Sequence, residues 1–217
     1  MTHVKRHIIF DLDGTLIDSS ESIFASISRA FDESNQVLRY PLTNKIIGPP
    51  LQETLSHLSG TEDLSILKLL SDRFKENYDK KGFLQTKVYP GISAMLTTLM
   101  GYNFYMYVVT NKRIVPTLKI LNHLGWDKYF KEICSIDSIR NFGNDKSKAG
   151  ILLHIIKNNN ISNNSVYIGD HKDDLVASTK AGIPFFHATW GYGNHISDQI
   201  NTLESPQDLC RYFIKDT

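Results

Sequence analysis

The ten residues HIIFDLDGTL, positions 7–16, join a short apolar run to two carboxylates and a glycine. The run from His7 to Phe10 has the length and composition of a strand that is buried on both faces of a sheet. In open α/β sheets, ligands bind beyond the carboxyl ends of the strands, which is where Asp11 and Asp13 stand. Carboxylates two residues apart can project to the same side of an extended segment. Such a pair suits either divalent metal binding or separate roles as nucleophile and general acid/base.

The next residues decide between a catalytic loop and a calcium loop. Gly14 permits a tight turn after the strand, and Thr15 offers a hydroxyl group that can fix the loop. An EF-hand loop needs further acidic positions and a glutamate at its twelfth position, whereas this chain continues with Leu16, Ile17 and Asp18. The pattern therefore favours a catalytic site.

Four further β-rich runs follow, at 104–109, 133–136, 166–168 and 184–187. Most of them are separated by segments whose apolar residues recur at spacings of three and four, for example Ile114, Leu118 and Leu121, which predicts amphipathic helices. This alternation of strands and helices predicts an α/β fold with a doubly wound parallel sheet.

One connection is too long for that pattern. About ninety residues separate the first strand from the second, and a simple crossover needs far fewer. Their apolar spacing is helical, as in Ile23, Ile27 and Phe31. We predict an all-α cap domain at residues 19–85, inserted into an α/β core domain formed by residues 1–18 and 86–217.

Composition narrows the function classes. The 217 residues carry 24 basic and 23 acidic side chains, a net charge of +1, so we expect neither nucleic acid nor an anionic membrane as a partner. We find no apolar run of 18 residues and no signal-peptide pattern. The two cysteines, Cys134 and Cys210, show no CxxC spacing, so we expect no zinc site and a reducing, cytoplasmic location.

The run Asp11-Leu12-Asp13-Gly14-Thr15 after the first predicted strand resembles the haloacid dehalogenase superfamily, whose phosphatases begin with a DxDGT motif at this place. The resemblance covers almost the whole chain, because other motifs follow in order at strand ends. Thr110-Asn111 is similar to the second motif, which implies that both residues bind the transferring phosphoryl group. The segment GDHKDD at 169–174 is similar to the fourth motif, which implies that Asp170 is a metal ligand and that Asp174 supports it.

The third motif of the superfamily is a single lysine before a helix. Lys146 and Lys148 both precede the apolar helical pattern at 151–156. The spacing favours Lys148, which the resemblance then implies to be catalytic and phosphate-binding.

The resemblance implies a magnesium-dependent phosphatase that works through an aspartyl phosphate. Asp11 would be the nucleophile, while Asp13 would protonate the leaving oxygen and later deprotonate a water molecule. Mg²⁺ and Lys148 would offset the charge of the phosphate dianion. The metal ligands would be Asp11, the backbone carbonyl of Asp13, and Asp170.

Within the superfamily, a DxDGT motif indicates phosphate esters rather than halides. Sugar phosphomutases share the second aspartate and remain an alternative. A non-enzymatic receiver domain is a second alternative, although receivers carry adjacent acidic residues and no helical insertion.

The cap would select the substrate. The segments Gly48-Pro49-Pro50-Leu51, Phe74 to Tyr78 and Trp190-Gly191-Tyr192-Gly193 resemble the phosphoglycolate phosphatase group. We therefore expect a small phosphorylated metabolite such as 2-phosphoglycolate, whose carboxylate could meet the cap cations Arg29, Arg39, Lys45 or Lys80. We expect a monomer or a homodimer.

Overall fold

A computed structural model describes residues 7–138, 147–161, 164–193, 196 and 200–214 of the chain. Its main sheet has six parallel strands in the order β5-β4-β1-β6-β7-β8. The strands are β1 His7–Phe10, β4 Tyr105–Thr110, β5 Phe130–Ser135, β6 Ser165–Gly169, β7 Phe185–Ala188 and β8 Asn201–Leu203. The predicted α/β class with a doubly wound parallel sheet is confirmed.

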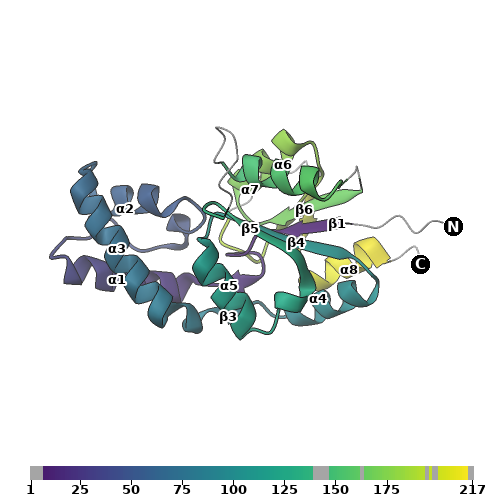
Figure 1. Ribbon diagram of the computed structural model, residues 1–217, viewed down its shortest axis with the longest axis horizontal. Helices are drawn as coiled ribbons and strands as arrows, with labels where there is room; N and C mark the ends of the chain where they lie inside the picture. The colour runs from purple at the N-terminus through teal and green to yellow at the C-terminus, as the bar shows by residue number, and fades with distance from the viewer. Residues whose placement is uncertain (1–6, 139–146, 162–163, 194–195, 197–199, 215–217) are drawn as a thin grey trace.

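Helices cover both faces of this sheet (Figure 1). One face carries α4 Ile92–Gly101, α5 Ile114–His123 and α8 Pro206–Ile214, and the other carries α6 Lys148–Asn158 and α7 Lys172–Ala181. Successive residues of β1 serve the two layers in turn, since Ile8 packs in the first apolar cluster and Ile9 in the second. Burial on both faces explains why the central strands read as unbroken apolar runs.

The strand order determines where in the fold the predicted site residues come together. Phe10 of β1 lies level with Val108 of β4 and with Ile168 of β6. The chain runs from β1 to β4 and β5 on one side, and then crosses to β6 on the other side of β1. A reversal of this kind opens a crevice at the carboxyl ends of the strands. Asp11, Thr110 and Asp170 all stand at that edge.

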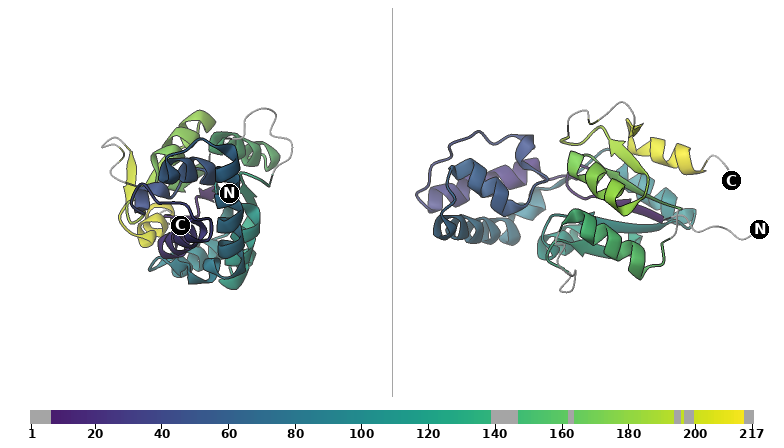
Figure 2. Two further views of the ribbon diagram at one scale, coloured as in Figure 1. Left: turned by 90° about the vertical axis from the view of Figure 1, so that its left-hand side faces the viewer. Right: turned by 90° about the horizontal axis from the view of Figure 1, so that it is seen from above.

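The cap helices are α1 Ser20–Glu33, α2 Leu51–Ser59 and α3 Leu64–Lys80. They lie together at one end of the molecule (Figure 2). They share an apolar cluster of their own, to which Ile27, Leu55 and Leu70 contribute fully buried side chains. Short 3₁₀ turns accompany the helices at Asn44–Ile46 and Gly82–Gln85, and a third lies outside the cap at Asp127–Tyr129.

Two short strands connect the cap with the sheet. β2 Ile17–Asp18 and β3 Lys87–Val88 pair in antiparallel fashion, with Asp18 opposite Lys87. The chain therefore leaves the core and returns to it at neighbouring points. All three cap helices fall inside the predicted interval 19–85, while the domain boundaries themselves stay a prediction. Within the described part of the chain, no helix is long and apolar enough to cross a membrane.

Candidate active site

Asp11 continues the path of β1 and is 3% exposed. Its backbone N–H donates to the Ile168 carbonyl at 2.8 Å, which extends the contact between β1 and β6. One carboxylate oxygen, Oδ2, lies 3.0 Å from Lys148 Nζ. The other, Oδ1, is buried and has no hydrogen-bond partner among the described residues. One oxygen of the expected nucleophile is thus left without a hydrogen bond from the described residues.

Burial raises the pKa of Asp11 well above its ordinary value. Lys148 opposes this shift, while Asp174 and Asp170 add to it. A buried carboxylate beside two others is costly to ionise unless a further positive charge lies close to it.

A tight loop follows Asp11. The Leu12 carbonyl accepts from the N–H groups of Leu16 at 2.9 Å and Ile17 at 3.1 Å, and Gly14 N–H donates to the Ile17 carbonyl at 2.8 Å. Gly14 adopts a φ of +85°, which favours glycine. A β-carbon at Gly14 would overlap the carboxylate of Asp170. Glycine is needed here both for the turn and for the close approach of Asp170.

Asp170 follows β6 and is held mainly by backbone groups. Its Oδ2 accepts from Tyr192 N–H at 2.7 Å and from Gly193 N–H at 3.2 Å, and its Oδ1 accepts a weaker bond from Thr15 Oγ1 at 3.3 Å. Burial and the neighbouring Asp174 raise the pKa of Asp170 to about 6, although the Tyr192 N–H lowers it. The segment Trp190 to Gly193, which indicated only a subfamily, therefore helps to build the site.

Asp174 lies in the first turn of α7, and both of its oxygens are occupied. Oδ1 accepts from Lys148 Nζ at 2.5 Å and from the Tyr167 hydroxyl at 2.9 Å, while Oδ2 accepts from His171 N–H at 3.0 Å. The helix begins only at Lys172, so Asp170 precedes it and the two aspartates do not share a helix face. They meet because the chain turns sharply between β6 and α7.

The carboxyl groups of Asp11, Asp170 and Asp174 could hold a metal ion, since one oxygen of each lies within 4.8 Å of the others. Clustered carboxylate oxygens are the ligands that Mg²⁺ prefers. The residues fit such an ion, because Asp11 Oδ1 has no other partner among the described residues and Asp170 Oδ1 has only a long bond. Asp174 already accepts three hydrogen bonds from described residues, which agrees with a supporting role.

Asp13 turns away from this cluster. Its two oxygens lie 3.0 and 3.1 Å from Lys112 Nζ, and Ser19 Oγ donates to Oδ1 at 2.5 Å. Lys112 Nζ also lies 4.6 Å from the centre of the Tyr78 ring. Burial alone would lower the pKa of Lys112, but the Asp13 carboxylate outweighs this and the pKa is raised. The sequence motifs did not single out Lys112, although it directly follows Thr110-Asn111.

Lys148 is the first residue of α6 and joins two aspartates. Ser147 caps this helix by accepting from Gly150 N–H at 3.3 Å. The Lys148 ammonium lies 3.0 Å from Asp11 and 2.5 Å from Asp174. Burial alone would lower the pKa of Lys148, yet these carboxylates raise it. Lys146, the alternative, lies outside the described residues.

Thr110 and Asn111 stand at the carboxyl end of β4. Thr110 is buried, and its Oγ1 accepts from Lys112 N–H at 3.1 Å. The Asn111 amide donates to the Gly48 carbonyl in the cap at 2.9 Å. Both residues line the cavity described next, and their predicted roles in phosphate binding remain a prediction.

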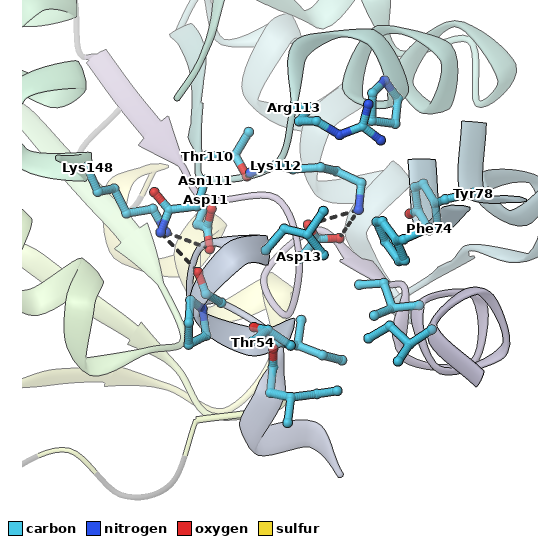
Figure 3. Close-up of a pocket in the computed structure, with 18 residues that line it drawn as sticks. Asp11, Asp13, Thr54, Phe74, Tyr78, Thr110, Asn111, Lys112, Arg113 and Lys148 are labelled. Carbon is cyan, nitrogen blue, oxygen red and sulfur yellow. Dashed lines mark hydrogen bonds and ion pairs between the residues drawn. The ribbon is translucent and has the colours of Figure 1, made fainter. Parts of the chain in front are cut away.

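A cavity of about 90 Å³ lies between the strand ends and the cap helices. Asp11, Asp13, Thr110 and Lys148 line it from the core, and side chains of α1, α2 and α3 line it from the cap. Figure 3 shows Lys148 beside Asp11, and Lys112 between Asp13 and Tyr78. A reacting group held at Asp11 would have Asp13 on the side that faces the cap.

Comparison with known proteins agrees with this geometry. The family model for haloacid dehalogenase-like hydrolases matches residues 8–188. Phosphoglycolate phosphatase of Aquifex aeolicus is 31% identical over an alignment that covers 95% of each chain. The crystal structure of a predicted phosphatase from Clostridium acetobutylicum is 27% identical, with a TM-score of 0.84 over 97% of this chain and 99% of that one.

A third relative has a different activity in its name. Tyrosine-protein kinase PtkA of Mycobacterium tuberculosis is 28% identical over 86% of this chain. The chain spans only 62% of the length of PtkA.

Proposed function

Because the chain is an enzyme of the haloacid dehalogenase-like hydrolase family, we propose that it is a magnesium-dependent phosphatase that hydrolyses a small phosphate monoester through an aspartyl phosphate. This proposal rests mainly on the contacts of the two carboxylate oxygens of Asp11. One of its oxygens is held by Lys148, while the other is buried in the carboxylate cluster without a partner among the described residues. Its cavity also contains Asp13 and Thr110.

In the first half of the reaction, Asp11 attacks phosphorus and the bond from phosphorus to the ester oxygen breaks. Asp13 gives a proton to that oxygen, so the product leaves as a neutral alcohol. Lys148 holds Asp11 in place and offsets charge on the phosphoryl oxygens. When bound to Asp11 and Asp170, Mg²⁺ would supply the remaining positive charge that a carboxylate needs to approach a phosphate dianion.

In the second half, a water molecule attacks phosphorus and the bond to Asp11 breaks. Asp13 takes the proton from this water and returns to its initial state. The ion pair with Lys112 and the bond from Ser19 hold the Asp13 side chain in position. Since this carboxyl group points away from Asp11, Asp170 and Asp174, it stays available for both proton transfers.

The family match argues against the receiver-domain alternative. A phosphomutase would use the same residues but would return the phosphoryl group to a sugar. Release of inorganic phosphate separates the two activities. A cytoplasmic location and a small phosphorylated metabolite as the partner follow from the sequence and belong to this proposal.

The test uses p-nitrophenyl phosphate with and without Mg²⁺. The chain should release phosphate with Mg²⁺, lose this activity in EDTA, and recover it when Mg²⁺ is added back. Asp11→Asn should lower kcat by roughly 10⁴-fold or more, because the nucleophile is lost while its shape is kept. Full activity without metal, or in Asp11→Asn, would contradict the mechanism.

A further inference from the structure

The cap side of the cavity points to the chemical class of the substrate. We propose that the enzyme prefers phosphate esters of small, uncharged and largely apolar alcohols over esters whose alcohol carries a carboxylate. This inference rests on the phosphatase function proposed above, and it goes further by naming the leaving group.

Hydrocarbon side chains form the cap side of the cavity. Ile23 and Ile27 come from α1, Ile47 from the segment before α2, Leu51 from α2, and Phe74 from α3. Thr54 also lines the cavity, but its hydroxyl donates to the Ile46 carbonyl at 3.1 Å. A charged group pressed against such a surface loses its hydration without gaining a partner.

Every described cation that lines the cavity is already paired. Lys148 lies against Asp11 and Asp174, and Lys112 holds both oxygens of Asp13. Arg113 donates to both oxygens of Asp79 at 2.8 and 2.6 Å. A carboxylate on the leaving group would have to break one of these pairs, and the pair with Lys112 holds the proposed general acid Asp13.

The cap cations that could have met a substrate carboxylate do not line this cavity. Arg29, Arg39, Lys45 and Lys80 are all absent from its described lining. Lys45 lines a separate hollow on the cap, and Lys80 pairs with Glu76 at 2.7 Å. The four cap cations considered for the carboxylate of 2-phosphoglycolate therefore have no counterpart in the cavity, whereas the segments at 48–51 and 74–78 do contribute to its lining.

One polar group on the cap side can take a further partner. The Tyr78 hydroxyl is buried and lines the cavity, and the charge of Lys112 lies close to it. A single neutral oxygen on the alcohol could meet it. The preferred alcohol is thus apolar with room for one hydroxyl or ether oxygen.

The first experiment compares two esters of matched shape. Isobutyl phosphate and 2-phosphoglycolate differ in that a CH(CH₃)₂ group replaces a carboxylate. With the full chain and Mg²⁺, kcat/KM for isobutyl phosphate should be at least about tenfold higher, because only the charged ester loses hydration at the apolar surface. Glycolate is the better leaving group chemically, so leaving-group ability cannot produce this preference. Equal rates, or faster hydrolysis of 2-phosphoglycolate, would overturn the inference.

A pair of variants tests the surface itself. Ile23→Lys places a cation on the cap side at a half-buried position, and should shift the ratio of the two kcat/KM values toward 2-phosphoglycolate by about tenfold. Ile66→Lys is the matched control, since Ile66 is also half-buried in the cap cluster but does not line the cavity. The inference fails if both variants, folded by circular dichroism, keep the wild-type ratio.

Hydrolysis of p-nitrophenyl phosphate separates the two proposals. If this ester is hydrolysed with Mg²⁺ but 2-phosphoglycolate is preferred over isobutyl phosphate, only the inference about the leaving group is wrong. If none of the three esters is hydrolysed, the proposed phosphatase is wrong, and the inference falls with it.

Discussion

Lys112 fixes the orientation of the proposed general acid. It contacts both oxygens of Asp13, and its side chain is 7% exposed. Lys112→Met keeps the unbranched chain up to the ε position but removes the ammonium group, so Asp13 keeps only the bond from Ser19 among the described side chains. We expect kcat to fall by roughly 10²-fold with a much smaller change in KM, because Asp13 acts on the reacting oxygen rather than on ground-state binding. Steady-state kinetics check this, with the exposed Lys68→Met as control. A change confined to KM would instead indicate a role in substrate binding.

Lys148 is expected to matter more than Lys146. Lys148→Ala leaves Asp11 and Asp174 without their shared cation, which should lower kcat by at least roughly 10³-fold. The loss of one partner from a buried ion pair should also lower the free energy of unfolding by about 3 kcal/mol. Lys146→Ala should change neither quantity appreciably. Phosphate release and urea unfolding of both variants decide the assignment, and the reverse order would give the role to Lys146.

Among single residues, the sequence indicates those whose type and spacing form a motif. Asp11, Asp170 and Lys148 fall into that class, and the structure brings them together. Lys112 belongs to no motif, and Tyr192 was indicated only as part of a subfamily segment. Their importance for the site depends on contacts with residues far along the chain, Asp13 and Asp170. A lysine after a strand is usually solvated, and only the fold shows that this one is buried.

Among the elements, the central strands were the easiest to predict. β1, β4 and β6 are buried on both faces, so their sequences are continuous apolar runs that end at the carboxylate or hydroxyl residues of the site. β5 begins at Phe130 rather than at 133, because the exposed Lys131 interrupts its apolar pattern. β8 was missed, since two of its three residues are exposed and polar.

The carboxylate cluster where β1, β6 and α7 meet should make the metal-free protein sensitive to pH. The pKa of Asp170 is raised from 3.8 to about 6 by burial, so the native state binds this proton more tightly than the unfolded state. Stability should therefore fall as the pH rises from about 4 through about 6. Bound Mg²⁺ should remove this penalty, because it stabilises the ionised carboxylates.

Thermal melts at pH 5 and pH 8 test this expectation. The increase in Tm on adding Mg²⁺ should be larger at pH 8, where the cluster is ionised, than at pH 5, where protons compete with the metal. Asp170→Asn should nearly abolish the difference. An equal increase in Tm at both pH values would indicate that Mg²⁺ binds outside the carboxylate cluster.

On the scale of the whole molecule, several contacts between described residues join the cap to the core around the cavity. Arg113 pairs with Asp79 of α3, Asn111 donates to the Gly48 carbonyl, and Ser19 N–H donates to the Tyr192 hydroxyl at 2.7 Å. All of them surround the site, so the structure shows the cap closed over Asp11. The sequence predicted the position of the insertion from its length, but the closed arrangement depends on pairs of distant residues.

The arrangement of the connecting strands makes it possible to test the cap by removing it. Asp18 and Lys87 lie opposite each other in β2 and β3, so a short Asn-Gly turn can replace residues 19–85. Asp11, Thr110, Lys148 and Asp170 all come from outside this interval, and we expect Mg²⁺ affinity, measured by calorimetry, to stay within about tenfold of the full chain. Selectivity between isobutyl phosphate and 2-phosphoglycolate should disappear, because the surface that disfavours the carboxylate is gone. The rate on both esters should also fall, since Ser19 no longer holds Asp13 and water enters the site. A folded deletion variant that still prefers isobutyl phosphate would show that the core selects the leaving group, whatever the cap contributes to the rate.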